Sequence, residues 1–133
     1  MKIKTSELQG IALDWAVGKC VGVHHESFIA AQSFKEHAYQ YSTGWAQGGP
    51  IIERERIDLN RFSGQWAARL WAGWREIEYP QGGAEHAAAY RSRKVSQSIE
   101  QQGPTALIAA MRCYVASKLG DEVEIPAELM EAA

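Results

Sequence analysis

Residues 103 to 120 read Gly-Pro-Thr-Ala-Leu-Ile-Ala-Ala-Met-Arg-Cys-Tyr-Val-Ala-Ser-Lys-Leu-Gly and predict a long amphipathic helix over 104–119. Proline is favoured at the first helical position, where its missing N–H has no intrahelical partner to lose. Gly120 can adopt the left-handed conformation that ends a helix. The apolar face recurs at helical spacing and is formed by Leu107, Ala110, Met111, Tyr114 and Val115.

A second helix is predicted over 7–20, with Ser6 as its N-cap, Gln9 completing a capping box and Gly22 closing the end. Both helices present Ala-rich faces with one large ring each, which permits close approach. Asp14 falls one position before Trp15 and is therefore expected to face solvent. The apolar stripe consists of Leu8, Ile11, Ala12, Trp15 and Ala16.

The middle of the chain is less regular. The alternating run 51–59 favours a strand with a solvated middle, and 123–125 favours a short edge strand. Residues 62–78 fit either a helix or two short strands around Gly73. Residues 84–102 suggest an exposed helix or a mobile arm. We therefore expect a single α+β domain over 1–133, with the two helices packed on a small, mostly antiparallel sheet and with 62–101 as an inserted or mobile segment.

Composition limits the classes of function. The chain has 133 residues, is 46% hydrophobic and 23% charged, and carries a formal charge of −2 with a pI of about 6.1. No global positive field is available to hold a nucleic-acid backbone. The N-terminus lacks the apolar run of a signal peptide, and no membrane association is expected. Cys20 and Cys113 are interpreted as buried free thiols, and no spacing of ligands suggests a metal site.

A glycine-rich stretch carries the main binding hypothesis. Residues 42–53 read Ser-Thr-Gly-Trp-Ala-Gln-Gly-Gly-Pro-Ile-Ile-Glu, and three glycines with one proline argue against a helix up to Pro50. Backbone N–H groups of such a loop can approach a phosphate, and Trp45 can stack on a flat group. The alternative is an ordered turn whose Trp45 covers the core.

No catalytic set is recognisable. The sequence lacks nucleophile-elbow, phosphate-loop and zinc-protease motifs, so we expect neither an enzyme nor a cofactor. The pair His24 and His25 is best interpreted as a surface pair. Alternating charges on 53–56 favour an exposed salted face over paired catalytic carboxylates.

A second group mixes aromatic rings with guanidinium groups. Such mixtures can stack on bases or anchor a protein interface, but a Trp stripe can equally be core with its arginines in water. The basic residues further on could contact phosphate or serve only solubility. The two sets are Trp66, Arg69, Trp71, Trp74 and Arg75, and then Arg91, Arg93 and Lys94.

Several blocks resemble the NinX-like family of small proteins from lambdoid phages and prophages. They are the opening Met-Lys-Ile-Lys-Thr-Ser-Glu-Leu of 1–8, the Ala-Leu-Asp-Trp-Ala-Val of 12–17, the stretch 42–53, the Gly-Pro-Thr-Ala-Leu-Ile-Ala-Ala-Met-Arg of 103–112, and 120–126. Tyr41 and Gly44 depart from the residues usual in the family's central motif, and 62–101 has no evident counterpart. The resemblance implies a phage origin and the host cell cytoplasm, but no defined activity.

Two functions are consistent with a small phage accessory protein that binds without catalysis. One is sequestration of a nucleotide-like host immune signal. The other is binding of a host or phage protein, or of nucleic acid, through the Trp/Arg segment. A homo-oligomer is expected because five tryptophans are many to bury in so short a chain. The residues predicted to contact the nucleotide-like ligand are Ser42, Thr43, Trp45, Gln47, Gly48, Gly49, Glu53 and Arg112.

Overall fold

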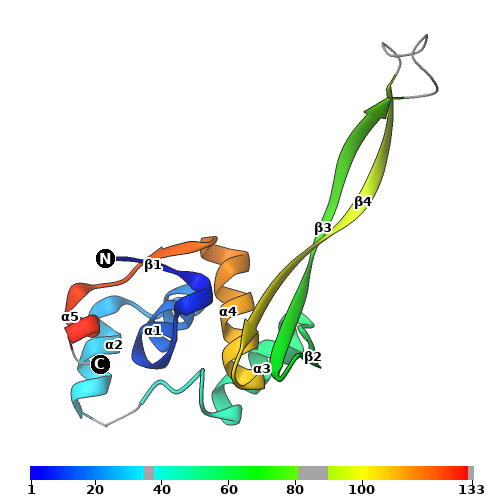
Figure 1. The fold of residues 1–133 in the computed structure, drawn as a ribbon. Coiled ribbons are helices and arrows are strands. Elements are labelled where there is room, and N and C mark those ends of the chain that lie inside the picture. Colours follow the sequence, from blue (N-terminus) through cyan, green and yellow to red (C-terminus); the bar gives the residue numbers. More distant parts are fainter. Residues whose placement is uncertain (35–37, 81–89, 132–133) are drawn as a thin grey trace.

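The computed structural model describes residues 1–34, 38–80 and 90–131. Its elements form an α+β fold, as predicted, with a two-stranded sheet β1-β5 and a three-stranded sheet β2-β3-β4, both antiparallel (Figure 1). In chain order they are β1 (Lys2–Lys4), the 3-10 helix η1 (Thr5–Glu7), α1 (Gly10–Val21), α2 (His25–Phe34), α3 (Trp45–Glu55), β2 (Asp58–Phe62), β3 (Gln65–Pro80), β4 (Tyr90–Gly103), α4 (Ala106–Leu119), β5 (Glu122–Glu124) and α5 (Ala127–Glu131).

Helix α4 forms the centre of the core. The residues predicted for its apolar face are all buried, and α4 contacts α1, α3 and the three-stranded sheet. It begins two residues later than predicted, because Thr105 is the N-cap and its hydroxyl accepts a bond from the Ile108 N–H at 3.1 Å. Pro104 therefore precedes the cap instead of opening the helix.

Helix α1 also begins later than predicted. Ser6 is not its cap, because Thr5–Glu7 form the 3-10 turn η1 and the helix starts at Gly10. The Thr5 hydroxyl donates to the Gly120 carbonyl at 2.6 Å and fixes this turn against the end of α4. The prediction for Gly22 is confirmed: its φ is 96°, and the N–H of Val23 bonds the carbonyl of Gly18 at 2.8 Å.

The prediction that Asp14 faces solvent is wrong. Asp14 is 7% exposed, and its Oδ1 accepts a bond from the Ser42 N–H at 2.8 Å. The apolar stripe on α1 is wider than the five predicted positions, and Leu13 and Val17 are also fully buried. Burial of α1 on several sides therefore encloses the carboxylate, and the hydrogen bond to the incoming segment offsets its desolvation.

The glycine-rich stretch is a helix, contrary to the prediction. Gly44 is the N-cap of α3, and the helix runs through Pro50 to Glu55. Pro50 and Ala46 are both exposed, so water can solvate the Ala46 carbonyl that proline leaves without a donor. A Cβ at Gly48 would lie 2.4 Å from the Tyr41 carbonyl oxygen and 2.6 Å from Leu107, so glycine permits close packing that compensates for its low helix propensity.

The prediction of a strand over 51–59 is also wrong, because most of this run belongs to helix α3. Ile51 to Glu55 continue α3, and Arg56 ends it in the left-handed conformation with φ 55°. Only Asp58 and Leu59 of the predicted strand belong to β2, which ends at Phe62.

Residues 62–80 and 90–103 form a long hairpin. Strand structure is confirmed within 62–78, but Gly73 does not separate two short strands, because β3 runs through it as one strand from Gln65 to Pro80. A helix over 90–102 is wrong, and residues 84–89 of that prediction lie outside the described part. Ile99 of β4 is directly opposite Leu70 of β3, so a thin apolar stripe suits a two-stranded ladder with one face on α4.

The far part of this hairpin projects from the body of the protein (Figure 1). Strand β2 pairs only with Gln65–Arg69, so beyond that point β3 and β4 pair with each other alone. We call residues 70–80 and 90–99 the arm, and the remaining described residues the body. Gly73, with φ 106°, forms a β-bulge in β3 within the arm.

Candidate functional site

The start of α3 lies against the start of α4 and encloses a hollow. Its lining consists of Ser42, Thr43, Trp45 and residues 105–108, and its volume is about 240 Å³. Trp45 is the first residue of α3 and is 57% exposed, so the interpretation of Trp45 as a cover of the core is wrong. We call this feature the Trp45 hollow.

Two helix N-termini meet at the Trp45 hollow. The first N–H groups of any α-helix have no carbonyl partner within the helix, and the helix dipole makes this end electropositive. Trp45 and Ala46 occupy these positions in α3, and Ala106 and Leu107 occupy them in α4. Of these residues, Trp45, Ala106 and Leu107 belong to the lining of the hollow, so their N–H groups are the main-chain donors nearest to a ligand there.

Ser42 supplies an unusual polar group. Ser42 is 1% exposed and is one of the residues that line the hollow, and its buried Oγ has no hydrogen-bond partner. Among the described residues it is the one buried side-chain oxygen or nitrogen in this condition. An unpaired buried hydroxyl is costly, and a polar ligand in the hollow would satisfy it.

The glycine-rich stretch itself does not present free amides as predicted. The N–H groups of Thr43 and Gly44 bond the Gln40 carbonyl, and those of Gln47 and Gly48 bond the Gly44 carbonyl. The donors that remain for a ligand are those of the helix starts. The geometry thus differs from that of a phosphate-cradling loop. The candidate site nevertheless lies in the segment of the chain that the sequence analysis singled out.

The other predicted ligand residues have separate positions. Gln47 accepts a bond from the Gln40 N–H at 2.8 Å and donates to the Ala38 carbonyl at 3.1 Å, so it fastens the preceding loop. Gly49 lies within α3 and Glu53 is exposed on its last turn. Neither they nor Gln47 belong to the lining of the Trp45 hollow, and Gly48 serves helix packing.

Arg112 lies at a different place. It is 9% exposed, and its Nε and Nη1 donate to the carbonyls of Leu8 and Gln102, each at 2.8 Å. Burial lowers the pKa of its guanidinium group. These bonds join α4 to Leu8, the residue that follows η1, and to β4, and Arg112 is not part of the lining of the Trp45 hollow.

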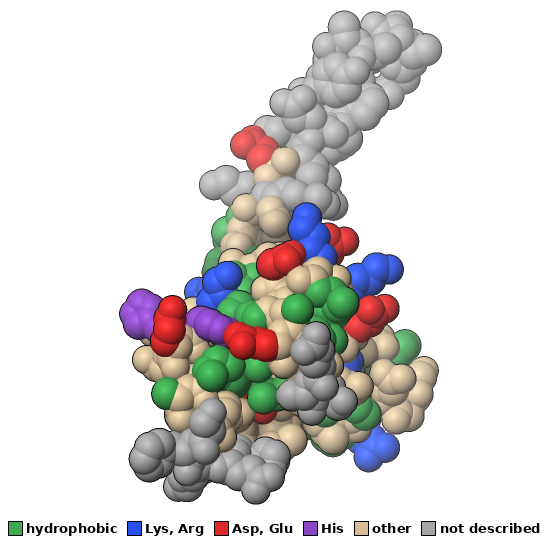
Figure 2. Space-filling view, turned by 90° about the vertical axis from the view of Figure 1, so that its left-hand side faces the viewer, with side chains coloured by type: hydrophobic (Ala, Val, Ile, Leu, Met, Phe, Trp, Pro, Cys, Tyr) green, Lys and Arg blue, Asp and Glu red, His purple; other side chains and the backbone are tan. Residues whose placement is uncertain are grey.

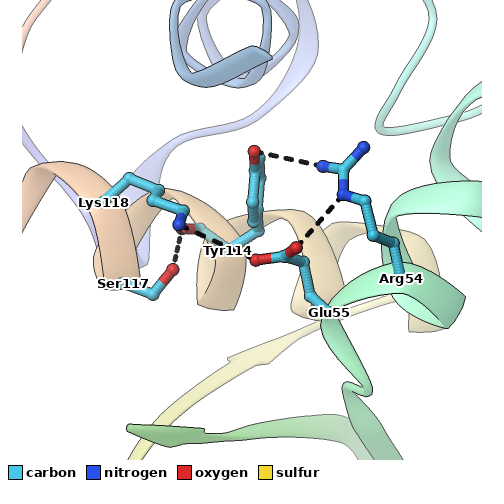
Figure 3. A network of polar contacts seen from close by, with 5 residues as sticks. All are labelled: Arg54, Glu55, Tyr114, Ser117 and Lys118. Carbon is cyan, nitrogen blue, oxygen red and sulfur yellow. Dashed lines mark hydrogen bonds and ion pairs between the residues drawn. The ribbon is translucent and has the colours of Figure 1, made fainter.

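A polar network holds the other end of α3 against α4 (Figure 3). Arg54 Nη2 donates to the Tyr114 hydroxyl at 3.3 Å, and Arg54 Nε lies 3.1 Å from Glu55. Lys118 Nζ lies 3.8 Å from the same carboxylate. Burial is the main cause that raises the pKa of Tyr114. Because the network fixes the end of α3, the position of Trp45 at its start follows from the rigidity of the helix.

The arm carries the second candidate surface. Trp71 is opposite Ser98 and Trp74 is opposite Ser96, and the bulge between them places both rings on one face of the hairpin. They are 58% and 61% exposed and meet edge to face, with centroids 6.1 Å apart. Trp66, by contrast, is half-buried under Arg61 in the three-stranded part.

Charges near the two rings do not form a positive field. Arg69 lies 3.8 Å from Glu100, and Glu76 is exposed further along the strand. On the face shown in Figure 2, acidic and basic side chains are interspersed over the body. The residues of the predicted basic cluster, Arg91, Arg93 and Lys94, belong to strand β4. Their side chains lie outside the described part.

One histidine of the 24–25 pair has structural partners. His25 is not a free surface residue: its Nδ1 accepts from the Trp15 indole at 3.1 Å and its Nε2 lies 2.6 Å from Glu128. In the part of the chain that the structure describes, no group of three His, Cys, Asp or Glu side chains could hold a metal ion. Within the same ranges, no helix is long and apolar enough to cross a bilayer.

Comparison with known proteins identifies the family. The sequence profile of the family described as bacteriophage P22 NinX matches residues 4–118. The match covers most of the chain, so the protein belongs to the phage NinX family, and it is a phage accessory protein. A search among curated proteins gave no match.

Proposed function

We propose that this protein binds without catalysis and sequesters a small anionic, nucleotide-like ligand at the Trp45 hollow in the host cell cytoplasm. The carrying observation is the buried, unpaired Ser42 hydroxyl in a hollow on which two helix N-termini converge. A phosphate fits main-chain donors and a hydroxyl without any cationic side chain. The volume of about 240 Å³ suits a phosphate group more than a whole nucleotide, so the organic part would lie outside, against the exposed ring of Trp45.

Serine 42 provides a test that separates binding from folding. Ser42→Ala removes a hydroxyl that has no partner, so the unfolding free energy is expected to remain equal or to rise. Ligand affinity is expected to fall roughly 10-fold, as for the loss of one hydrogen bond to a charged group. Melting curves of wild type, Ser42→Ala and Trp45→Ala with cyclic and linear nucleotides give the readout.

Trp74→Ala is the matched control, because this ring lies on the arm and outside the hollow. It should keep the nucleotide-induced shift of the wild type. The proposal is wrong if no nucleotide shifts the wild-type melting temperature, or if Ser42→Ala and Trp74→Ala reduce the shift equally.

A second candidate function rests on the arm. Two exposed tryptophans in edge-to-face contact form an apolar anchor of the kind that dominates protein interfaces, and the neighbouring charges are balanced. This surface favours a protein partner over a nucleic-acid backbone, which requires a positive field.

The partner can be sought in infected host cells with tagged wild type, Trp71→Ser/Trp74→Ser and Trp45→Ser. We expect a nuclease-resistant protein to be retained by wild type and Trp45→Ser but lost by the double variant. After purification of that protein, each lost anchor should weaken binding by about 30-fold. Retention that disappears on nuclease treatment would indicate nucleic acid instead.

A further inference from the structure

The second edge of β4 is unpaired. β4 bonds β3 on one side, and no other strand of the described ranges pairs with it. Such an edge offers a row of N–H and C=O groups to another strand. The body reaches β4 near its end, where Cys113 Sγ donates to the Ile99 carbonyl at 3.2 Å and where Ser6 and Arg112 line an open hollow beside Glu100–Gln102. From there outward the edge continues along the arm (Figure 1).

The two edges of the arm differ in their capacity to pair. β3 contains the bulge at Gly73 and ends at Pro80, and both features are known to stop a strand from accepting another. β4 has no proline, and its only glycine is its last residue, Gly103. The regular edge of β4 is therefore the one suited to strand addition.

The sequence of this edge is complementary to itself. Residues 94–100 read Lys-Val-Ser-Gln-Ser-Ile-Glu. Residues at equal distances on either side of Gln97 are chemically complementary: two serines, two aliphatic side chains, and one lysine with one glutamate. An antiparallel pairing of two copies centred there places Lys94 opposite Glu100, Val95 opposite Ile99 and Ser96 opposite Ser98, each of them twice. This is the isologous contact that a two-fold axis requires. We infer that two copies of this chain pair through β4 about a two-fold axis at Gln97, and so form one continuous antiparallel sheet.

The register within each copy extends this complementarity. Glu76 of β3 is opposite Lys94, and Arg69 is opposite Glu100. Across the paired copies, one row of residues would therefore read Glu76, Lys94, then Glu100 and Arg69 of the second copy. The charges alternate over four strands, and opposite charges directly across a ladder are stabilising.

The pairing also gives the arm the neighbours that it lacks. A two-stranded ribbon is marginal in water, and further strands make it stable. Residues opposite each other in an antiparallel pair point to the same face, so Trp71 and Trp74 of both copies would share one surface. The inference concerns the edge of the arm and is independent of the Trp45 hollow.

Charge variants test the register. Light scattering of the wild type at tens of micromolar should give twice the chain mass of 14.8 kDa. Lys94→Glu and Glu100→Lys each place like charges opposite one another twice, and each should raise the dimer Kd at least about tenfold. An equimolar mixture of the two variants restores opposite charges at every such position, so dimers should return as heterodimers.

In the mixture each chain still carries its own substitution and any folding defect that the substitution causes. A return of dimers in the mixture therefore cannot result from better folding. A wild type that remains monomeric, or a mixture that remains as dissociated as its components, would overturn the inference.

Cysteine cross-linking gives a second measurement. Gln97→Cys should form a disulfide-linked dimer under mild oxidation, because directly opposite residues lie about 4.5–5.5 Å apart. Ser96→Cys is the matched control: its own copy would be displaced by two residues, beyond disulfide reach, but it should cross-link when mixed with Ser98→Cys. Wild type sets the background from Cys20 and Cys113. Equal cross-linking of Gln97→Cys and Ser96→Cys alone would contradict the register.

Discussion

The body and the arm are specified by different physical means. In the body, α1 and α4 bury Leu13, Ala16, Met111 and Val115 completely, and shape complementarity determines the structure. In the arm, Leu70 and Ile99 at the base pack on the core, but further out Trp71 and Trp74 stay exposed, and the register of β3 against β4 and one bulge fix the backbone. Large apolar side chains are therefore evidence of core in one region and of an interaction surface in the other.

The largest expected effect tests this contrast directly. Leu13→Ala should reduce the unfolding free energy by about 2–5 kcal/mol, because its fully buried side chain leaves a cavity. Trp74→Ala removes a larger side chain but should change it by no more than about 0.5 kcal/mol. Chemical denaturation measures both. Comparable losses would show that the arm is packed in solution, and the paired dimer is then the first candidate for the packing.

Asp14 provides the next test within the body. Asp14→Ala leaves the buried Ser42 N–H without its acceptor and should cost about 1–3 kcal/mol. Asp14→Asn keeps an acceptor oxygen of the same shape and should cost clearly less. Equal losses in the two variants would show that the charge, and not the hydrogen bond, makes the contribution.

The two cysteines predict a dependence on pH that belongs to the body alone. Burial raises the pKa of Cys20 to about 11 and of Cys113 to about 12, from 9.0. The unfolded chain releases these protons first, so stability is unaffected well below pH 9 and falls as the pH rises from 9 towards 11. Each thiol contributes a slope of at most about 1.4 kcal/mol per pH unit.

Denaturation at pH 8 and pH 10 measures this fall, and Cys113→Ala should reduce it. Alkylation supplies the comparison with the arm. At pH 8, Cys113 of the native protein should react slowly, whereas a cysteine introduced by Ser98→Cys on the exposed strand should react fast. Similar rates would indicate frequent opening of the body.

The smallest expected effect on the unfolding free energy concerns Trp45, an exposed ring on the body. Trp45→Ala should change the unfolding free energy by no more than about 0.5 kcal/mol, because the side chain is mostly in water. With a nucleotide ligand present, affinity should fall by roughly 5- to 150-fold through lost stacking. A melting temperature lowered by several degrees without ligand would instead mark Trp45 as structural.

The sequence predicted the elements that follow simple periodicity. The apolar spacing of α4 and the closing glycine of α1 were sufficient, as was the alternation around Val123 in β5. Helix starts were less accurate, because the buried hydroxyl of Thr5 stabilises a 3-10 turn that local capping rules do not anticipate. The strand β4 was missed because its sequence is mostly polar and charged and has little strand propensity, and its pairing with β3 overrides that local preference.

The candidate site was predicted in part. Ser42, Thr43 and Trp45 do meet in one hollow, but the start of α4 that completes it lies about sixty residues away in the sequence. The glycines of α3 indicated a loop because local propensity cannot show the close contact of Gly48 with Leu107. Asp14 was wrongly predicted to face solvent because one face of α1 was assumed to be exposed to water. Tertiary packing overrode local preference at each of these positions.

The pairing of β1 with β5 has a consequence for the order of folding during synthesis. Lys2–Lys4 bond Glu122–Glu124, so the two-stranded sheet cannot close until residue 124 has left the ribosome. Helix α4, on which α1 packs, is also made late. The strands of the long hairpin are neighbours in sequence and need no later segment, so they can pair while the body is still incomplete. The β4 edge, through which we infer that two copies pair, would thus be formed before the body is closed.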